Sequence, residues 1–191
     1  MRILFLTSIS FATVYLVASI STAGDYNGDG YDDLAIGVPG ETINNKMSAG
    51  LVHVVFGSAN GLSTSNDQLY HEDSGTRNKA EAFDFYGYAI ASGDFDNDGF
   101  DDLAVGAPEW RNAKGRVNVI YGSLSGPLRT DMQFINQSKS GYSGNAEPND
   151  QFGAALVVGD FDGDNYDDLA VGVLPQLPGA PSPPPKTFWC D

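Results

Sequence analysis

The chain has little of the residues on which catalytic and disulfide-bonded proteins depend. Its 191 residues include one Cys, Cys190, and two His. A single Cys excludes a disulfide within the chain. His53 lies in an alternating, strand-like run and His71 at the end of another, and we interpret both as tolerated strand residues and not as catalysts. The sequence has no GxSxG or HExxH motif, so we expect a protein that is not an enzyme.

Basic residues are also scarce. Lys and Arg number 10 against 25 Asp and Glu, which gives a formal net charge of -15 at pH 7. Because nucleic-acid binding requires a basic surface, we expect no nucleic-acid partner. Fourteen of the 25 acidic residues fall in three short runs, at residues 25–33, 94–102 and 160–168, so the acidity is local.

A long apolar run occurs only at the N-terminus. It follows Arg2, extends from Ile3 to Ile20 and ends in small residues up to Ala23, which predicts a secretory signal peptide at residues 1–23. The protein would then be secreted or at the cell surface. The run is also long enough for an uncleaved anchor, in which case the chain would contact a membrane. A third reading is a degenerate first strand, because Val17 lies at the same distance from its acidic run as Tyr86 does.

Three acidic runs repeat with their surroundings. The segment "GDYNGDGYDDLAIGVP" begins at Gly24, "GDFDNDGFDDLAVGAP" at Gly93 and "GDFDGDNYDDLAVGVLP" at Gly159. A second segment repeats too, since "GLVHVVFGSANGL" from Gly50 matches "GRVNVIYGSLSGP" from Gly115. Matching segments in a fixed order predict a repeat architecture.

Each acidic run has the pattern of a calcium loop. Oxygen-bearing side chains stand at positions 1, 3, 5 and 9, and Ca²⁺ accepts about six to eight oxygens, including backbone carbonyls such as that of position 7. Position 6 must turn sharply at positive φ, which Gly30 and Gly99 adopt freely and Asn165 tolerates. We expect about three calcium ions, with these ligands: Asp25, Asn27, Asp29, Tyr31 and Asp33; Asp94, Asp96, Asp98, Phe100 and Asp102; Asp160, Asp162, Asp164, Tyr166 and Asp168.

The runs are not EF-hands. An EF-hand requires Glu at position 12 and a helix on each side. Position 12 is Ile36, Val105 or Val171, and the flanking residues are short, β-branched and bounded by Gly and Pro, so each loop is predicted to join two strands. The alternative is a solvated acidic turn without metal. The acids at position 8 are expected to point to solvent: Asp32, Asp101 and Asp167.

These residues resemble the FG-GAP repeat of integrin α-subunit β-propellers. Phe152-Gly153 and Tyr86-Gly87 supply the first motif, and Gly106-Ala107-Pro108 supplies the second. The acidic runs match the calcium loop of that family. The resemblance implies an all-β fold made of four-stranded propeller blades. In the second blade we expect strands near residues 86–93, 103–107, 116–122 and 132–136; in the first, near 34–38, 51–57 and 68–71.

Residues 24–175 supply about two and a half blades, whereas the smallest propeller needs roughly 260 residues. We therefore expect a partial propeller from a longer protein, with assembly of several copies as the alternative. Residues 176–191 form a Pro-rich tail that we predict to be disordered.

The resemblance implies a secreted calcium-binding module for adhesion or ligand recognition, with an extracellular protein or glycan as partner. One alternative is an accessory propeller of a secreted hydrolase, similar to that of glycosylphosphatidylinositol-specific phospholipase D. Another is a carbohydrate-binding propeller. The sequon at residues 136–138 would make the chain a glycoprotein in a eukaryote.

Overall fold

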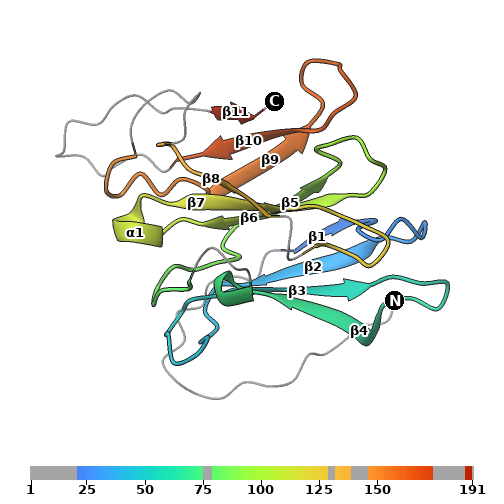
Figure 1. Cartoon of the computed structure of the whole chain (residues 1–191), viewed down its shortest axis with the longest axis horizontal. Helices are drawn as coiled ribbons and strands as arrows, with labels where there is room; N and C mark the ends of the chain where they lie inside the picture. Colours follow the sequence, from blue (N-terminus) through green and yellow to red (C-terminus); the bar gives the residue numbers. More distant parts are fainter. Residues whose placement is uncertain (1–20, 75–78, 129–131, 139–145, 174–187, 191) are drawn as a thin grey trace.

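The computed structural model describes residues 21–74, 79–128, 132–138, 146–173 and 188–190, and these build three antiparallel sheets (Figure 1). The first sheet contains β1 (Ser21–Gly24), β2 (Asp33–Val38), β3 (Leu51–Phe56) and β4 (Ser63–Tyr70). The second contains β5 (Ile90–Gly93), β6 (Asp102–Ala107), β7 (Arg116–Ile120) and β8 (Met132–Ile135). The third contains β9 (Ala155–Gly159), β10 (Asp168–Gly172) and β11 (Phe188–Cys190).

Helical structure is limited to short turns in the described ranges. They are the 3₁₀ turn η1 (Glu72–Ser74) and α1 (Trp110–Ala113), in which Arg111 and Asn112 have positive φ. No helix in these ranges is long and apolar enough to cross a membrane.

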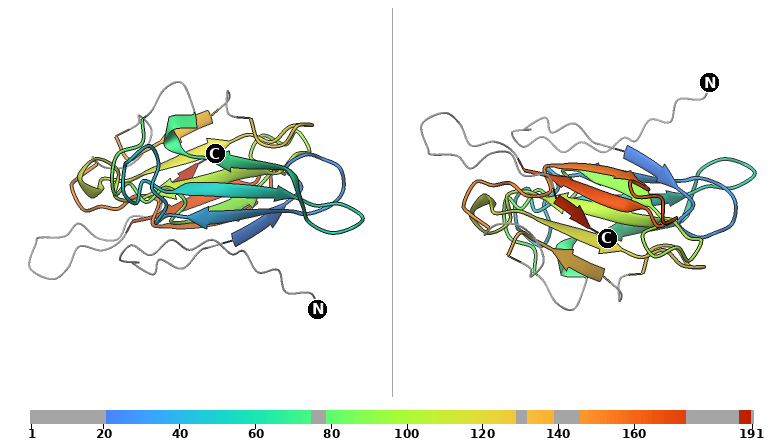
Figure 2. Two further views of the ribbon diagram at one scale, coloured as in Figure 1. Left: turned by 90° about the horizontal axis from the view of Figure 1, so that it is seen from below. Right: turned by 90° about the horizontal axis from the view of Figure 1, so that it is seen from above.

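The two complete sheets are meanders, in which strands consecutive in sequence are neighbours in space. The predicted all-β fold is confirmed, and each expected strand of the two blades is present, although β5 begins at Ile90 and not near residue 86, and β4 begins at Ser63 and not near residue 68. The three sheets are stacked side by side, with the first strands β1, β5 and β9 adjacent to one another (Figures 1 and 2). The stack that the described residues form does not close on itself, which is consistent with the predicted partial propeller.

Apolar side chains between neighbouring sheets form the core. Tyr26, Val54 and Tyr70 of the first sheet pack with residues such as Leu103 of the second. A second cluster joins the second and third sheets. Strand β6, in the middle sheet, is buried at every residue, whereas Val157 on β9 is 58% exposed. Burial on both faces explains why the middle strands read as continuous apolar runs.

The close approach of neighbouring sheets explains why the Phe-Gly and Gly-Ala-Pro motifs occur together. A Cβ on Gly37 would lie 2.1 Å from the carbonyl oxygen of Gly87 in the next sheet. A Cβ on Gly106 would lie 2.1 Å from the oxygen of Gly153. The first motif of each blade thus packs its backbone against the second motif of the blade before it, and only Gly fits there.

Strand β1 spans the predicted cleavage point after Ala23. Its register pairs Ala23 with Leu34 and Thr22 with Ala35, as β5 pairs Ser92 with Leu103 and Ala91 with Ala104. Ser21 to Ala23 therefore take the place of an innermost blade strand, which accords with the reading of this segment as a degenerate first strand. Cleavage itself stays a prediction, and residues 1–20 lie outside the described part.

Strand β11 lies inside the tail that the sequence predicts to be disordered. It pairs with β10 in the position that β3 and β7 occupy beside β2 and β6. The prediction of disorder rests on the Pro residues of the tail, the last of which is Pro185. The Phe-Trp-Cys segment that follows has aromatic residues suited to a strand. Residues 174–187 lie outside the described part, so the prediction for them is untested.

Candidate metal loops and their contacts

The three acidic runs lie at the same end of the stack, each joining the first two strands of its sheet (Figure 1). Each loop is closed by hydrogen bonds to its own carboxylates. The first Asp accepts bonds from the backbone N–H groups of positions 5 and 6, at 2.9 to 3.2 Å. The Asp at position 5 accepts from the N–H of position 7, at 2.8 to 3.0 Å. The sequence thus dictates the same turn three times.

Left-handed backbone conformations make this curl possible. The predicted positive φ at position 6 is confirmed, with values of 84° at Gly30, 89° at Gly99 and 74° at Asn165. Position 4 also has positive φ, which we did not predict. It is occupied by Gly28, Asn97 and Gly163, and Gly and Asn tolerate this conformation best.

The carboxylate at position 9 is the buried end of each loop. Asp33 accepts hydrogen bonds from the N–H groups of Tyr26 at 3.1 Å and Gly57 at 2.8 Å. Asp102 makes the same two contacts in the second sheet. Burial raises the pKa of Asp33 to about 6 and that of Asp102 to about 7, and these backbone hydrogen bonds only partly offset it.

Positions 1, 3 and 9 converge in two of the loops. Asp94, Asp96 and Asp102 each offer a carboxylate oxygen within 4.8 Å of the others, and so do their counterparts Asp160, Asp162 and Asp168. Such a set suits a hard cation that prefers oxygen. In the first loop Asn27 stands at position 3 and donates to Asp29 at 3.3 Å.

The predicted ligands at positions 5 and 7 do not belong to these converging sets of carboxylates. One carboxylate oxygen of the Asp at position 5 accepts the hydrogen bond from the backbone N–H of position 7. The carbonyls of Tyr31, Phe100 and Tyr166 stay predicted ligands. The geometry thus favours the loops as cation sites, while the full ligand set remains a prediction.

The prediction that the acids at position 8 point to solvent is wrong for two of them. Asp101 accepts a hydrogen bond from the N–H of Asp25 at 2.7 Å, and its own N–H donates to the carbonyl of Asp25 at 3.1 Å. Asp167 makes the same pair of bonds with Asp94, at 3.0 Å each. Asp32 is exposed, as predicted. Position 8 therefore ties the second and third loops to the loop of the preceding blade.

A buried ion pair lies between the first two sheets at a distance from the loops. The Nε of Arg116 donates to Glu72 at 2.8 Å, and the guanidinium carbon lies 4.7 Å from the centre of the Trp110 ring. Burial and a hydrogen bond with Asp84 raise the pKa of Glu72, while Arg116 opposes the rise. We did not predict this pair, because nothing in the sequence relates η1 to β7.

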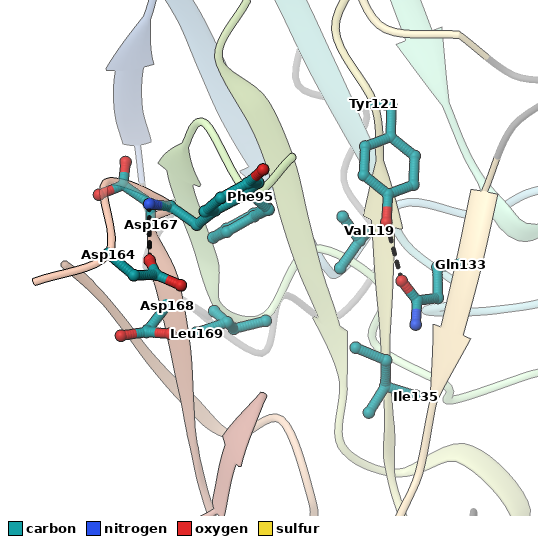
Figure 3. A pocket seen from close by; sticks show the side chains of 10 residues that line it. Phe95, Val119, Tyr121, Gln133, Ile135, Asp164, Asp167, Asp168 and Leu169 are labelled. Carbon is teal, nitrogen blue, oxygen red and sulfur yellow. Dashed lines mark hydrogen bonds between the residues drawn. The ribbon is translucent and has the colours of Figure 1, made fainter. Parts of the chain in front are cut away.

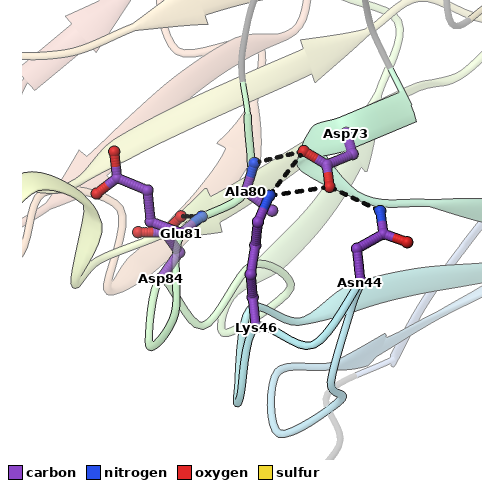
Figure 4. Close-up of polar contacts among 6 residues, drawn as sticks. All are labelled: Asn44, Lys46, Asp73, Ala80, Glu81 and Asp84. Atoms are coloured by element: carbon purple, nitrogen blue, oxygen red, sulfur yellow. Dashed lines mark hydrogen bonds and ion pairs between the residues drawn. The ribbon is translucent and has the colours of Figure 1, made fainter.

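A second polar network connects η1 with two loops that are not acidic runs, at residues 44–46 and 80–84 (Figure 4). Asp73 accepts from Asn44 and Ala80 at 2.9 Å and from Lys46 at 3.1 Å. Burial opposes ionisation of Asp73, but these donors outweigh it and lower its pKa. Asp84 accepts the N–H of Glu81 at 2.6 Å. These bonds connect η1 to residues 44–46 of the first sheet's loop and to Ala80.

Antiparallel four-stranded sheets, stacked around their first strands and carrying acidic hairpin loops, define this chain as a segment of a β-propeller. A comparison with known families identifies the FG-GAP repeat at residues 17–55, 86–120 and 152–174, about half of the chain. The chain belongs to the FG-GAP repeat family. The first match begins at Val17, within the segment that could also be a signal peptide.

Similar proteins fall into two groups. The chain is 32% identical over 164 residues to phosphatidylinositol-glycan-specific phospholipase D of Rattus norvegicus, which covers 84% of this chain and 18% of that protein. It is 37% identical over 154 residues to integrin alpha-4 of Xenopus laevis, with 80% and 14% covered. It is 36% identical over 167 residues to integrin alpha-PS2 of Drosophila melanogaster, with 83% and 11% covered. The chain thus spans less than a fifth of each relative.

Proposed function

We propose that the chain is an extracellular calcium-binding propeller module for adhesion or ligand recognition, without catalytic activity of its own. The single observation that supports it best is the threefold recurrence of one loop with one hydrogen-bond pattern. A solvated acidic turn would gain nothing from placing like charges together, whereas a bound cation offsets their repulsion. The proposed ligands are those of positions 1, 3, 5, 7 and 9.

Calcium titration tests the metal part of this proposal. Extracellular calcium modules bind at about 10⁻⁴ to 10⁻³ M. We expect chelator-treated protein to take up about three ions in calorimetry, with a gain of β signal in circular dichroism. Asp96→Ala, which removes the oxygen ligands at position 3, should remove or weaken one site. Glu41→Gln, which removes the same charge from an exposed residue outside the loops, is the matched control and should leave all three sites intact.

The recognition part of the proposal involves the opposite end of the blades. There an open cavity of about 510 Å³ is lined by Glu81, Phe83, Glu109, Arg111 and Asn149 among others. Several of these residues have positive φ, including Phe83 at 69° and Asn149 at 69°. Strained backbone of this kind often accompanies binding surfaces. A glycan array and a screen of extracellular matrix proteins would test it, and binding to neither would count against a recognition role.

The similarity to the phospholipases supports a second candidate, an accessory propeller of a secreted hydrolase. The matched region is their repeat segment, so any catalytic residues would lie outside this chain. Release of a glycosylphosphatidylinositol-anchored reporter by the native protein, isolated from its source, would favour this candidate. An inactive native protein that still binds a matrix ligand would favour adhesion.

A further inference from the structure

A groove lies between the second and third sheets. It encloses about 320 Å³ and is lined by side chains of β7 and β8 on one side and by the third acidic loop on the other (Figure 3). The residues that matter for its chemistry are Phe95, Tyr121, Gln133 and Ile135. The equivalent space between the first and second sheets is filled by a turn of the chain. That turn indicates what kind of segment the groove could bind.

The turn at residues 122–127 fills that equivalent space. Gln68 Nε2 donates to the carbonyl of Ser125 at 2.8 Å, and the Tyr70 hydroxyl donates to the carbonyl of Pro127 at 2.7 Å. A Cβ on Gly126 would lie 2.4 Å from Phe56 Cζ, so the turn packs directly on that ring. A β-turn with a Gly at this point is therefore the shape that these side chains receive.

The groove presents a related set of side chains one blade later, although Ile135, which takes the place of Tyr70, has no hydroxyl to donate to a turn. Gln133 lies opposite Val119 in its sheet, as Gln68 lies opposite Val54. By the same register Tyr121 replaces Phe56 and Ile135 replaces Tyr70. The Tyr121 hydroxyl donates to Gln133 Oε1 at 2.8 Å, which orients the amide so that its nitrogen can donate to a carbonyl.

The chain carries a second copy of the matching turn, at residues 57–62. Ser58 Oγ donates to the carbonyl of Gly61 at 2.7 Å, as Ser123 Oγ does to that of Gly126. Gly61 has φ of 92° and Gly126 of 84°. Unlike Gly126, a Cβ on Gly61 would meet nothing within 4 Å, and Leu62 is 48% exposed. This turn is preformed and exposed.

We propose that the groove binds the turn at residues 57–62 of a second copy of this chain. The turn carries no charged residue, so it can approach the acidic loop that forms one wall without repulsion. Its internal hydrogen bonds reduce the entropy that is lost on binding. The turn and the groove lie on different blades of each copy, so the association is head-to-tail and closes as a ring when the rotation permits.

Sedimentation velocity of the full chain in calcium tests the proposal. We expect concentration-dependent self-association that Gly61→Val and Gln133→Glu each weaken at least tenfold. Gly61→Val places a side chain where the ring of Tyr121 would lie. Gln133→Glu keeps the acceptor for Tyr121 but loses the donor. Leu124→Ala, on the turn that is already packed within the chain, is the control and should associate normally, since Leu124 is 84% exposed.

A competing peptide tests binding at the groove in the unmodified chain, so its result does not depend on whether the variants fold. A cyclic peptide with the sequence of residues 56–63 should compete with self-association, and the same peptide with Val at the position of Gly61 should not. A chain that stays monomeric at about 0.5 mM would overturn the proposal, even if the peptide binds, because the occupant would then be another protein. Self-association that survives both substitutions would overturn it as well.

Discussion

At the scale of single residues, the Asp at position 8 of an acidic loop has a structural role that its residue type alone does not indicate. Asp101 and Asp32 stand at the same position of successive repeats, yet one is bonded to the preceding loop and the other is exposed. The difference arises because a blade precedes Asp101 in the described structure. Position 8 could not be interpreted from one repeat, because its partner belongs to a residue 76 positions away.

Replacing Asp101 with Ala should therefore destabilise the contact between the first two sheets. The variant leaves the N–H of Asp25 without its carboxylate acceptor, and such a loss typically costs about 1–3 kcal/mol. Urea unfolding at fixed calcium measures it. Asp32→Ala is the matched control and should stay within about 0.5 kcal/mol of the wild type. Equal effects of the two substitutions would contradict the proposed tie between loops.

The carboxylates at position 9 should make the metal-free chain sensitive to pH. Burial raises the pKa of Asp33 to about 6 and of Asp102 to about 7, above the unfolded value of 3.8. The stability that this provides is fully present below the unfolded pKa and is lost as pH rises through the folded values. We expect the Tm of chelator-treated protein to fall between about pH 4 and 7.

Calcium should reverse that trend, because the ion requires ionised carboxylates and binds more tightly as pH rises. Thermal melts with and without calcium across this range provide the comparison. Parallel pH profiles in the two conditions would show that position 9 does not face the ion.

At the scale of strands and turns, the close approach of neighbouring blades can be tested at Gly106. A Cβ there would lie 2.1 Å from a backbone oxygen of the next blade, and backbone cannot move aside as a side chain can. Gly106→Ala should cost about 1–3 kcal/mol or more. Gly40→Ala is the control, since a Cβ on Gly40 meets nothing within 4 Å. Chemical denaturation of both variants decides, and a tolerated Gly106→Ala would contradict the packing.

Most strands could be predicted because the same strand and turn patterns recur in successive repeats. The alternation of apolar and polar residues at 51–57 and the Gly and Pro residues that bound the strands recur one blade later. The strand assignment in one repeat is therefore supported by the other. Strand β11 could not be predicted, because its sequence does not resemble the strands that take the same place in the other sheets and it follows a Pro-rich segment. The positive φ at position 6 of the loops could likewise be predicted, and the ligand set stays a prediction, whereas the pairing of Glu72 with Arg116 depends on how two blades meet.

At the scale of the whole molecule, the hydrogen bonds between loops would couple the proposed calcium binding to the stacking of blades. A loop that is ordered by calcium presents the N–H of its first Asp to the next blade in a fixed position. Loss of the ion should therefore loosen both the hairpin and the neighbouring sheet. Linkage sets the size of the effect, since a ligand stabilises the folded state by RT ln(1 + [L]/Kd).

With Kd of about 10⁻⁴ to 10⁻³ M, calcium at about 2 mM should contribute roughly 0.6–1.8 kcal/mol per site. Three sites would add about 2–5 kcal/mol, enough to raise the Tm by several degrees in a domain of this size. Scanning calorimetry in calcium, in magnesium and in chelator measures it. Because Mg²⁺ demands near-ideal octahedral geometry and keeps its waters, it should give little of the gain. An identical Tm in all three conditions would mean that the acidic loops stabilise the blades through their own hydrogen bonds alone.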